Sequence, residues 1–131
     1  MSLDIRTHHG IDRALSGVPV ALGDGSATVE LATTSTMAAD AQELVHGGFV
    51  FSLADHAAML AINEPTVVLG AAETRFLAPT RVGETLVAEA RVAAIDGKKH
   101  HVDVTVRSGE TTVCTGRFTC FVPSRHVLDR S

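Results

Sequence analysis

The chain has 131 residues, of which 45% are hydrophobic and 20% are charged, and its formal net charge is −4. This length predicts a single domain over residues 1–131, and the composition excludes wholesale disorder. An acidic balance with 5 Phe, no Trp and no Tyr argues against nucleic-acid binding. No apolar run is long enough to cross a membrane, and residues 1–10 contain no apolar leader, so we expect a cytoplasmic protein without a membrane partner.

The first part of the chain predicts a short helix, a hairpin and a long loop. We expect the helix over residues 11–15. Two strands over 18–22 and 27–32 flank a turn at residues 23–25, which is a hairpin signal. Residues 33–45 are polar and rich in alanine, and they predict a loop long enough for a functional role.

Residues 49–63 predict one long helix, because they are almost continuously apolar and contain neither Gly nor Pro. Pro65 ends this helix, since the residue before a proline is pushed out of the helical region. The polar side chains fall within about 100° of arc on a helical wheel. A surface helix has the opposite proportion of polar residues, so this helix must be enclosed, most simply by a curved sheet. The polar residues are Ser52, Asp55, His56 and Asn63.

Four strand-like runs follow the helix, over residues 67–77, 85–95, 102–108 and 112–122. Short turns separate them, so they predict a β-meander with antiparallel pairing. The two cysteines of the chain, Cys114 and Cys120, fall in the last run. They would lie about 20 Å apart in an extended strand, so we expect no disulfide between them. The order of elements predicts an α+β fold in which a curved antiparallel sheet wraps one long central helix.

Asp55 is the strongest candidate for a catalytic residue, because a carboxylate on so enclosed a helix is desolvated and needs a partner or a function. The alternative is a pairing role, such as accepting hydrogen bonds from a neighbouring subunit. His56 is adjacent, but consecutive helix positions do not face each other, so a direct Asp55–His56 pair is not expected. We expect His56 and Ser52 to line a substrate surface or to pack at an interface.

Gly47 and Gly48 stand at the start of the helix, where the first N–H groups lack internal partners and carry partial positive charge. Glycine lets a ligand approach these groups, so a carbonyl oxygen would be polarised there as in an oxyanion hole. A flexible helix cap is the alternative. His46 directly precedes the glycines, and it is a candidate to orient the loop or to line the pocket.

The segment from His46 to Asp55, HGGFVFSLAD, resembles the H-G-G-x-x-x-x-L-x-D signature of hotdog-fold acyl-CoA thioesterases, particularly the phenylacetate-pathway type. Residues 75–79 (RFLAP) and 82–84 (VGE) are similar to the family's F-L-x-P and following G-D/E turn. The similarity covers residues 27–122. It implies a hotdog fold, sheets joined between protomers, and a homodimer that often pairs into a homotetramer.

This resemblance implies hydrolysis of an acyl-CoA thioester to the free acid and CoA, with no cofactor beyond the CoA of the substrate. The N–H of Gly48 would bind the thioester carbonyl. Asp55 would come from the partner subunit, as nucleophile or as general base for water.

Asp40 is a further catalytic candidate, because it stands where relatives usually have an Asn that helps to hold the reacting water or thioester. Relatives also often have a Ser or Thr near residues 69–71 that assists the water, and Glu73 and Thr74 are its nearest substitutes here.

Coenzyme A carries phosphates, for which the sequence offers four basic candidates. Two of them, Lys98 and Lys99, follow a turn, so the alternative to phosphate binding is that they form the solvated tip of a hairpin. The seven histidines lack the spacing of a metal site, so we expect no metal. A hotdog acyl-CoA hydratase or dehydratase and a non-enzymatic acyl-CoA binder stay open as other functions. The basic candidates are Arg75, Arg81, Lys98 and Lys99.

Overall fold

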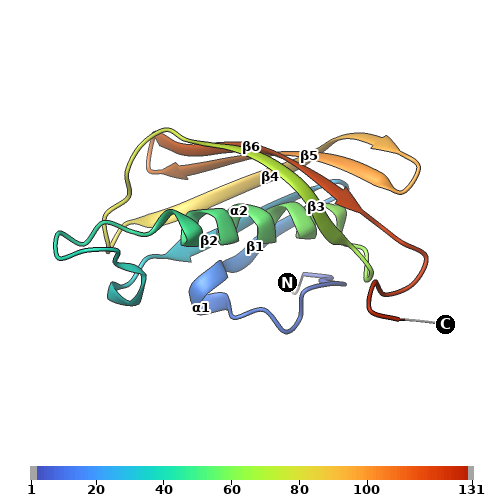
Figure 1. Cartoon of the computed structure of the whole chain (residues 1–131), viewed down its shortest axis with the longest axis horizontal. Coiled ribbons are helices and arrows are strands. Elements are labelled where there is room, and N and C mark those ends of the chain that lie inside the picture. Colours follow the sequence, from blue (N-terminus) through green and yellow to red (C-terminus); the bar gives the residue numbers. More distant parts are fainter. Residues whose placement is uncertain (1–2, 130–131) are drawn as a thin grey trace.

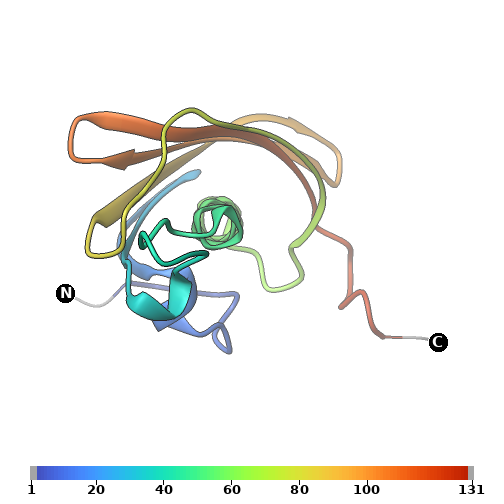
Figure 2. The ribbon, with the colours of Figure 1, turned by 60° about the vertical axis from the view of Figure 1, so that its left-hand side comes forward.

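The computed structural model describes residues 3–129, in which one long helix lies against a six-stranded antiparallel sheet (Figure 1). Viewed nearly along the helix, the sheet arches over it (Figure 2). The predicted α+β fold is therefore confirmed. The elements are α1 (Arg13–Ser16), β1 (Val18–Gly23), β2 (Ser26–Ala32), the 3₁₀ helix η1 (Ser35–Met37), α2 (Gly47–Ile62), β3 (Val68–Phe76), β4 (Thr85–Asp96), β5 (Lys99–Ser108) and β6 (Thr111–Phe121).

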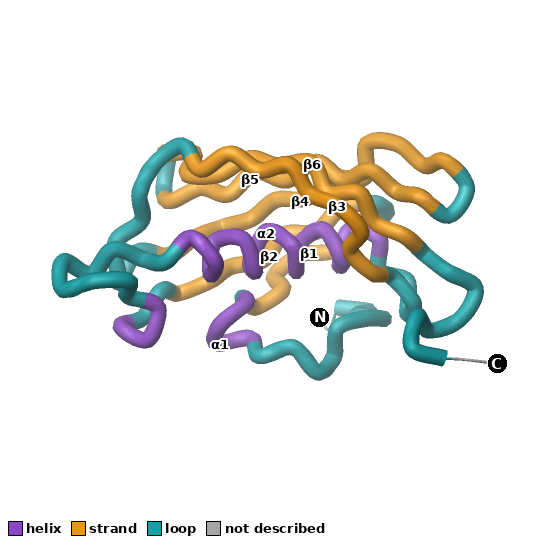
Figure 3. The backbone as a smooth tube through the Cα atoms, in the orientation of Figure 1, coloured by secondary structure: helices purple, strands orange, loops and turns teal. Residues whose placement is uncertain are grey.

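The strands are ordered β1-β2-β4-β5-β6-β3 across the sheet, and every neighbouring pair is antiparallel (Figure 3). The predicted meander after the helix is correct for β4, β5 and β6 but wrong for β3. β3 pairs with the last strand, so the connection over residues 77–84 crosses from one side of the sheet to its middle. As a result, β3 and β1 are the two edge strands.

Most elements differ from the predicted bounds by one or two residues, and the differences at α2 and β5 have local reasons. α2 begins at Gly47, two residues earlier than expected, and its C-cap is Asn63 with a left-handed φ of 54°. Asn tolerates this conformation, so the helix ends there, ahead of Pro65. β5 begins at Lys99 because Gly97, with φ 61°, allows a tight turn directly after β4.

The core lies between α2 and the concave face of the sheet. Val102, Val104 and Val106 of β5 are buried, while Asp103 between them and Arg107 after them are exposed, which confirms the predicted alternation. Both cysteines are buried in β6 as free thiols. Among residues 3–129, no helix is long and apolar enough to cross a membrane.

The sheet encloses only one side of α2, and residues 3–16, here called the N-terminal segment, cover the other (Figure 1). The Asn63 amide makes two hydrogen bonds of 2.8 Å with backbone groups of this segment. Ser52 Oγ lies 2.6 Å from Ser16 Oγ, and His56 Nδ1 lies 3.1 Å from the Ser16 carbonyl oxygen. The polar stripe of the helix is thus the attachment surface for the N-terminal segment.

Candidate active site

The start of α2 is capped by the side chain of His46. Its Nδ1 accepts a hydrogen bond of 2.8 Å from the Gly48 N–H, which is the donor expected to bind a thioester carbonyl. Within the single chain, the geometry is therefore that of an N-cap. A substrate carbonyl can reach the Gly48 N–H only when the imidazole turns away, and the exposed position of His46 leaves it free to do so.

A side chain at position 48 would meet the capping imidazole, so the cap and a larger residue there exclude each other. A Cβ there would lie 2.8 Å from His46 Nδ1, closer than real side chains approach. The capped helix start opens onto a mostly apolar cavity of about 490 Å³, which Leu15 and Phe49 line together with Ser52. The volume and apolar lining of this cavity are typical of a small-molecule pocket.

Asp55 lies seven residues further along α2 and opens onto a different cavity, of about 560 Å³. Its Oδ1 is buried and has no hydrogen-bond partner within residues 3–129. Burial raises the pKa of Asp55 to about 6. Burial, and then the Asp55 charge, raise the pKa of the nearby Cys120 thiol to about 12. An unpartnered, desolvated carboxylate facing a cavity is the typical arrangement of a catalytic acid or base.

Gly48 and Asp55 of one chain do not form a single site. Seven residues of helix separate them by about 10 Å along the axis, at about 1.5 Å per residue. Each opens onto its own cavity. A carbonyl held at Gly48 is therefore too far from Asp55 of the same chain for that carboxylate to attack it or to activate a water beside it.

His56 is buried at 2% exposure, so it does not line an open substrate surface. Its Nδ1–H donates to the Ser16 carbonyl, and burial is the main cause that lowers its pKa. Ser52 shares this anchoring role through its hydrogen bond to Ser16, although it also borders the apolar cavity at the helix start. His56 is thus a neutral, structural side chain in the protomer.

Asp40 lies in the exposed loop before the helix, outside the Asp55 cavity. Its Oδ1 accepts hydrogen bonds from the backbone N–H groups of Gln42 (3.0 Å) and Leu44 (3.2 Å). These contacts fix the turn that leads to His46. In the structure, Asp40 organises the loop of the site and is not brought beside Asp55.

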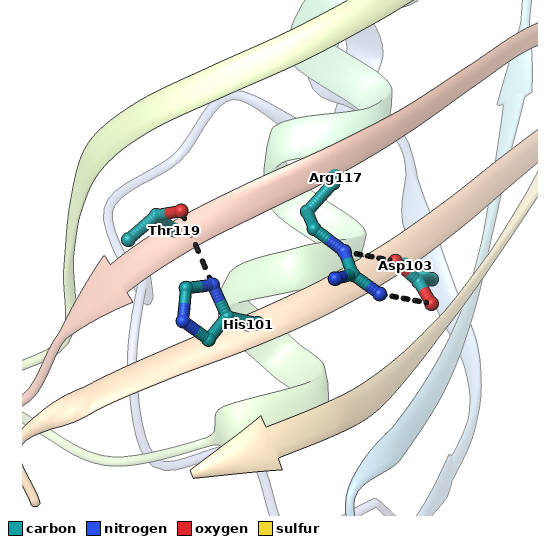
Figure 4. A network of polar contacts seen from close by, with 4 residues as sticks. All are labelled: His101, Asp103, Arg117 and Thr119. Atoms are coloured by element: carbon teal, nitrogen blue, oxygen red, sulfur yellow. Dashed lines mark hydrogen bonds and ion pairs between the residues drawn. The ribbon is translucent and has the colours of Figure 1, made fainter. Parts of the chain in front are cut away.

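The register of the sheet places the side chains of Glu73, Thr74 and Arg75 on different faces of β3. Glu73 pairs with Arg117, which binds the exposed Asp103 at 2.8 and 3.1 Å on the outer face of the sheet (Figure 4). Glu73 and Arg75 therefore lie on this outer face, away from α2. Thr74 alternates with them and lies on the helix side.

The remaining basic candidates lie at opposite ends of the sheet. Arg81 forms a backbone bridge with Leu44 in the loops near the start of α2. Lys98 and Lys99 belong to the β4–β5 hairpin at the other end of the sheet (Figure 1), where Lys99 Nζ lies 5.8 Å from the centre of the Phe121 ring. One chain therefore does not assemble a single basic rim for the phosphates of CoA.

Two residues of the Asp55 cavity were missed by the sequence analysis. His8 comes from the N-terminal segment and His126 from the chain after β6. No periodicity or spacing connects either with Asp55, because only the tertiary fold brings the two ends of the chain to α2. In the described part of the chain, no cluster of His, Cys, Asp or Glu is arranged to hold a metal ion.

Comparison with known proteins agrees with the fold and the helix motif. Residues 42–115 match the model of the thioesterase superfamily. This match spans more than half of the chain, so the chain belongs to the thioesterase superfamily.

Solved structures place the chain among hotdog-like proteins. An uncharacterized protein, PH1136 from Pyrococcus horikoshii, is 50% identical with a TM-score of 0.95, covering 98% of this chain and 99% of its own. The E. coli PaaI protein from the phenylacetic acid degradation operon is 28% identical (TM-score 0.79; coverage 87% and 84%). A hypothetical thioesterase from Streptococcus pneumoniae, solved with coenzyme A, shares the fold at 20% identity (TM-score 0.75; coverage 83% and 87%).

Two curated relatives are longer proteins. A methylthioribose-1-phosphate isomerase of Aquifex aeolicus is 50% identical over 116 residues, which are 88% of this chain and 25% of that protein. The transcription factor FapR of Caldanaerobacter subterraneus is 33% identical over 76 residues, 58% of this chain and 38% of that protein. The chain thus spans about a quarter and about two-fifths of these relatives.

Proposed function

We propose that this protein hydrolyses acyl-CoA thioesters to the free acid and CoA. The observation that carries this proposal is Asp55, which lines a cavity and has a buried, unpartnered Oδ1, on the same helix that begins with the exposed pair Gly47-Gly48. Membership of the thioesterase superfamily and the likeness to PaaI support it.

A homodimer is the smallest assembly that completes this site. β3 is an edge strand, and Phe76 at its end is 53% exposed beside the helix start. Val68 and Leu69 at its other end line the Asp55 cavity. Antiparallel pairing of two β3 edges would therefore bring Asp55 of the partner subunit toward the Gly48 of this chain. Pairing of such dimers into a homotetramer is a further expectation.

The same pairing gives the basic residues a common role. It would place Lys98 and Lys99 of the partner subunit at the end of the sheet where Arg75 and Arg81 of this chain lie. The phosphates of CoA would then meet basic residues from both chains, which suits charge-assisted binding of phosphate oxygens. No cofactor is needed, because CoA is part of the substrate.

In the proposed reaction, the thioester carbonyl displaces the His46 imidazole from the Gly48 N–H, which then stabilises the developing oxyanion. The acyl group occupies the apolar cavity beside Leu15 and Phe49. Asp55 of the partner subunit takes a proton from water as the water oxygen attacks the carbonyl carbon. The C–S bond then breaks, and the CoA thiolate takes the proton back. Direct attack by the carboxylate is the other route, and ¹⁸O from water would label Asp55 only in that case.

Release of free thiol from short, medium, long and aryl acyl-CoAs tests the proposal. We expect turnover with part of the panel and a loss of about 10³-fold in kcat for Asp55→Asn, within the range of general-base catalysis. Asp24→Asn, in the exposed turn between β1 and β2, is the matched control and should retain full activity. An Asp55→Asn enzyme as fast as the wild type would overturn the mechanism.

Binding of acyl-CoA without catalysis is the second candidate function. The hydrogen bond between His46 and the Gly48 N–H favours it, because that donor is already occupied in the chain. This function predicts tight binding of acyl-CoA by calorimetry and no thiol release. For the hydratase alternative, hydration of an enoyl-CoA without thiol release is the distinguishing result.

A further inference from the structure

The Asp55 cavity is also lined by an imidazole from another part of the fold. His8 belongs to the N-terminal segment, whereas Asp55 belongs to α2, and both line the same cavity. The cavity also borders β3, along which the proposed dimer forms. A molecule bound in this cavity therefore has both side chains in its surroundings.

The structure holds the His8 ring in a defined place. Thr7, which is buried, has its Oγ1 2.9 Å from His8 Nδ1. The His8 ring stacks on His56 with a centroid distance of 6.4 Å and an interplanar angle of 24°. His56 is itself fixed by the Ser16 carbonyl. The His8 backbone has φ 58°, a left-handed conformation that is uncommon for a residue with a side chain.

This environment determines what His8 can offer to a ligand. Burial, followed by the neighbouring His56, lowers the pKa of His8, so the ring is neutral near neutral pH. When its Nδ1–H is donated to Thr7 Oγ1, the ring presents Nε2 as a hydrogen-bond acceptor. The ionised Asp55 is also an acceptor. Two acceptors lining one cavity suit a molecule with two O–H donors, and water is the smallest such molecule.

We propose that His8 and Asp55 hold the attacking water together, an inference that rests on the proposed thioester hydrolysis. One O–H of the water gives its proton to Asp55 as the oxygen attacks the carbonyl carbon. The other O–H donates a hydrogen bond to His8 Nε2 and stays on the product acid. His8 thus positions the water without changing its own protonation over the reaction.

His8→Asn tests this role directly. Asn tolerates the left-handed backbone and keeps an amide near the Thr7 hydroxyl, but it has no group at the Nε2 position. We expect kcat to fall roughly 10- to 100-fold, as for the loss of a group that assists proton transfer, with KM within about twofold of the wild type. The matched control is His9→Asn. His9 is exposed and its Nε2 contacts the Ile5 carbonyl, outside the cavity, so this variant should retain wild-type kcat.

Chemical rescue separates positioning of water from a role in folding. His8→Gly suits the positive φ and leaves space for free imidazole. Added imidazole should restore part of kcat in this variant and leave the wild type unchanged. A loss of activity that imidazole does not restore, accompanied by a lower melting temperature, would show that His8 only supports the fold and would overturn the inference.

The remaining outcomes distinguish this inference from the proposed function. Wild-type kcat in His8→Asn, together with an inactive Asp55→Asn, would overturn the role of His8 and leave thioester hydrolysis standing. Absence of thiol release by the wild type across the whole panel would overturn the proposed function, and the water-holding role of His8 with it.

Discussion

The two sides of α2 follow opposite rules although they belong to the same helix. Leu53, Ala57 and Leu60 face the sheet and are at most 1% exposed. These residues stabilise the fold because their apolar surface is removed from water. The stability depends on the volume of each side chain more than on which apolar residue supplies it.

The other side carries the polar residues, and they are not equivalent. Ser52, His56 and Asn63 each form hydrogen bonds with the N-terminal segment. Asp55, on the same side, has a buried oxygen without a partner among residues 3–129. Three polar groups therefore attach a covering segment, and the fourth remains available for chemistry. Whether each group has a partner separates structural from functional residues here, since all four share the same polar stripe.

The largest stability effect should come from the side of α2 that faces the sheet. Leu53→Ala removes a fully buried side chain and should lower the free energy of unfolding by about 2–5 kcal/mol. Its neighbour Ser52→Ala loses one hydrogen bond and should cost only about 0.5–1.5 kcal/mol. Urea unfolding at one fixed protein concentration measures both. Equal losses in the two variants would contradict the distinction between the two sides.

Asp55→Asn should stabilise the protein at neutral pH, unlike every other change on this side of the helix. The folded protein raises the pKa of Asp55 from 3.8 to about 6, so it binds the proton more tightly than the unfolded chain. Stability due to this group is therefore greatest below about pH 4 and is lost as the pH rises to about 6. We expect the variant to gain about 1–3 kcal/mol at pH 7 and to lose this pH dependence.

Unfolding midpoints in urea between pH 4 and pH 8 check this prediction, with Asp24→Asn as the control that should keep the wild-type pH profile. A less stable Asp55→Asn at pH 7 would show that the carboxylate has a stabilising partner in the assembled protein. That result would favour the pairing role of Asp55 over the catalytic one.

A smaller effect than that of Leu53→Ala is expected at the end of the helix, where Asn63 binds the backbone of Asp4 and Arg6. Asn63→Ala loses both hydrogen bonds and places alanine at a left-handed φ, so it should cost about 1–2 kcal/mol. Asn63→Gly restores the backbone conformation alone and should recover part of this loss. Hydrogen exchange of residues 4–7 should become faster in both variants. Unchanged exchange would show that other contacts hold the N-terminal segment.

The elements of the fold follow from local patterns, but the neighbours of one strand do not. Alternating residues and short turns identify β4, β5 and β6 and their pairing. β3 has the same local character, yet it pairs with β6 at the far edge. Pairing partners are chosen by how the sheet closes over the helix, and a run of residues 67–77 contains no information about that closure.

The candidate site, like the fold, has features that the sequence predicts and features that only the structure shows. The motif from His46 to Asp55 locates the helix start and the carboxylate on the sequence. The sequence does not reveal that His46 caps the Gly48 N–H, nor that Glu73 and Arg75 lie on the outer face of the sheet. A one-residue change of register exchanges the two faces of a strand, so the orientation of these side chains depends on the pairing of the whole sheet.

The sequence by itself determined that an apolar helix with a narrow polar stripe must be enclosed, because that much apolar surface cannot remain in water. Only the tertiary structure decided what encloses each side: the sheet covers the apolar side, and the N-terminal segment covers the polar one. Only the structure, too, brought His8 to the Asp55 cavity, because contacts between distant parts of a chain depend on how its elements pack together.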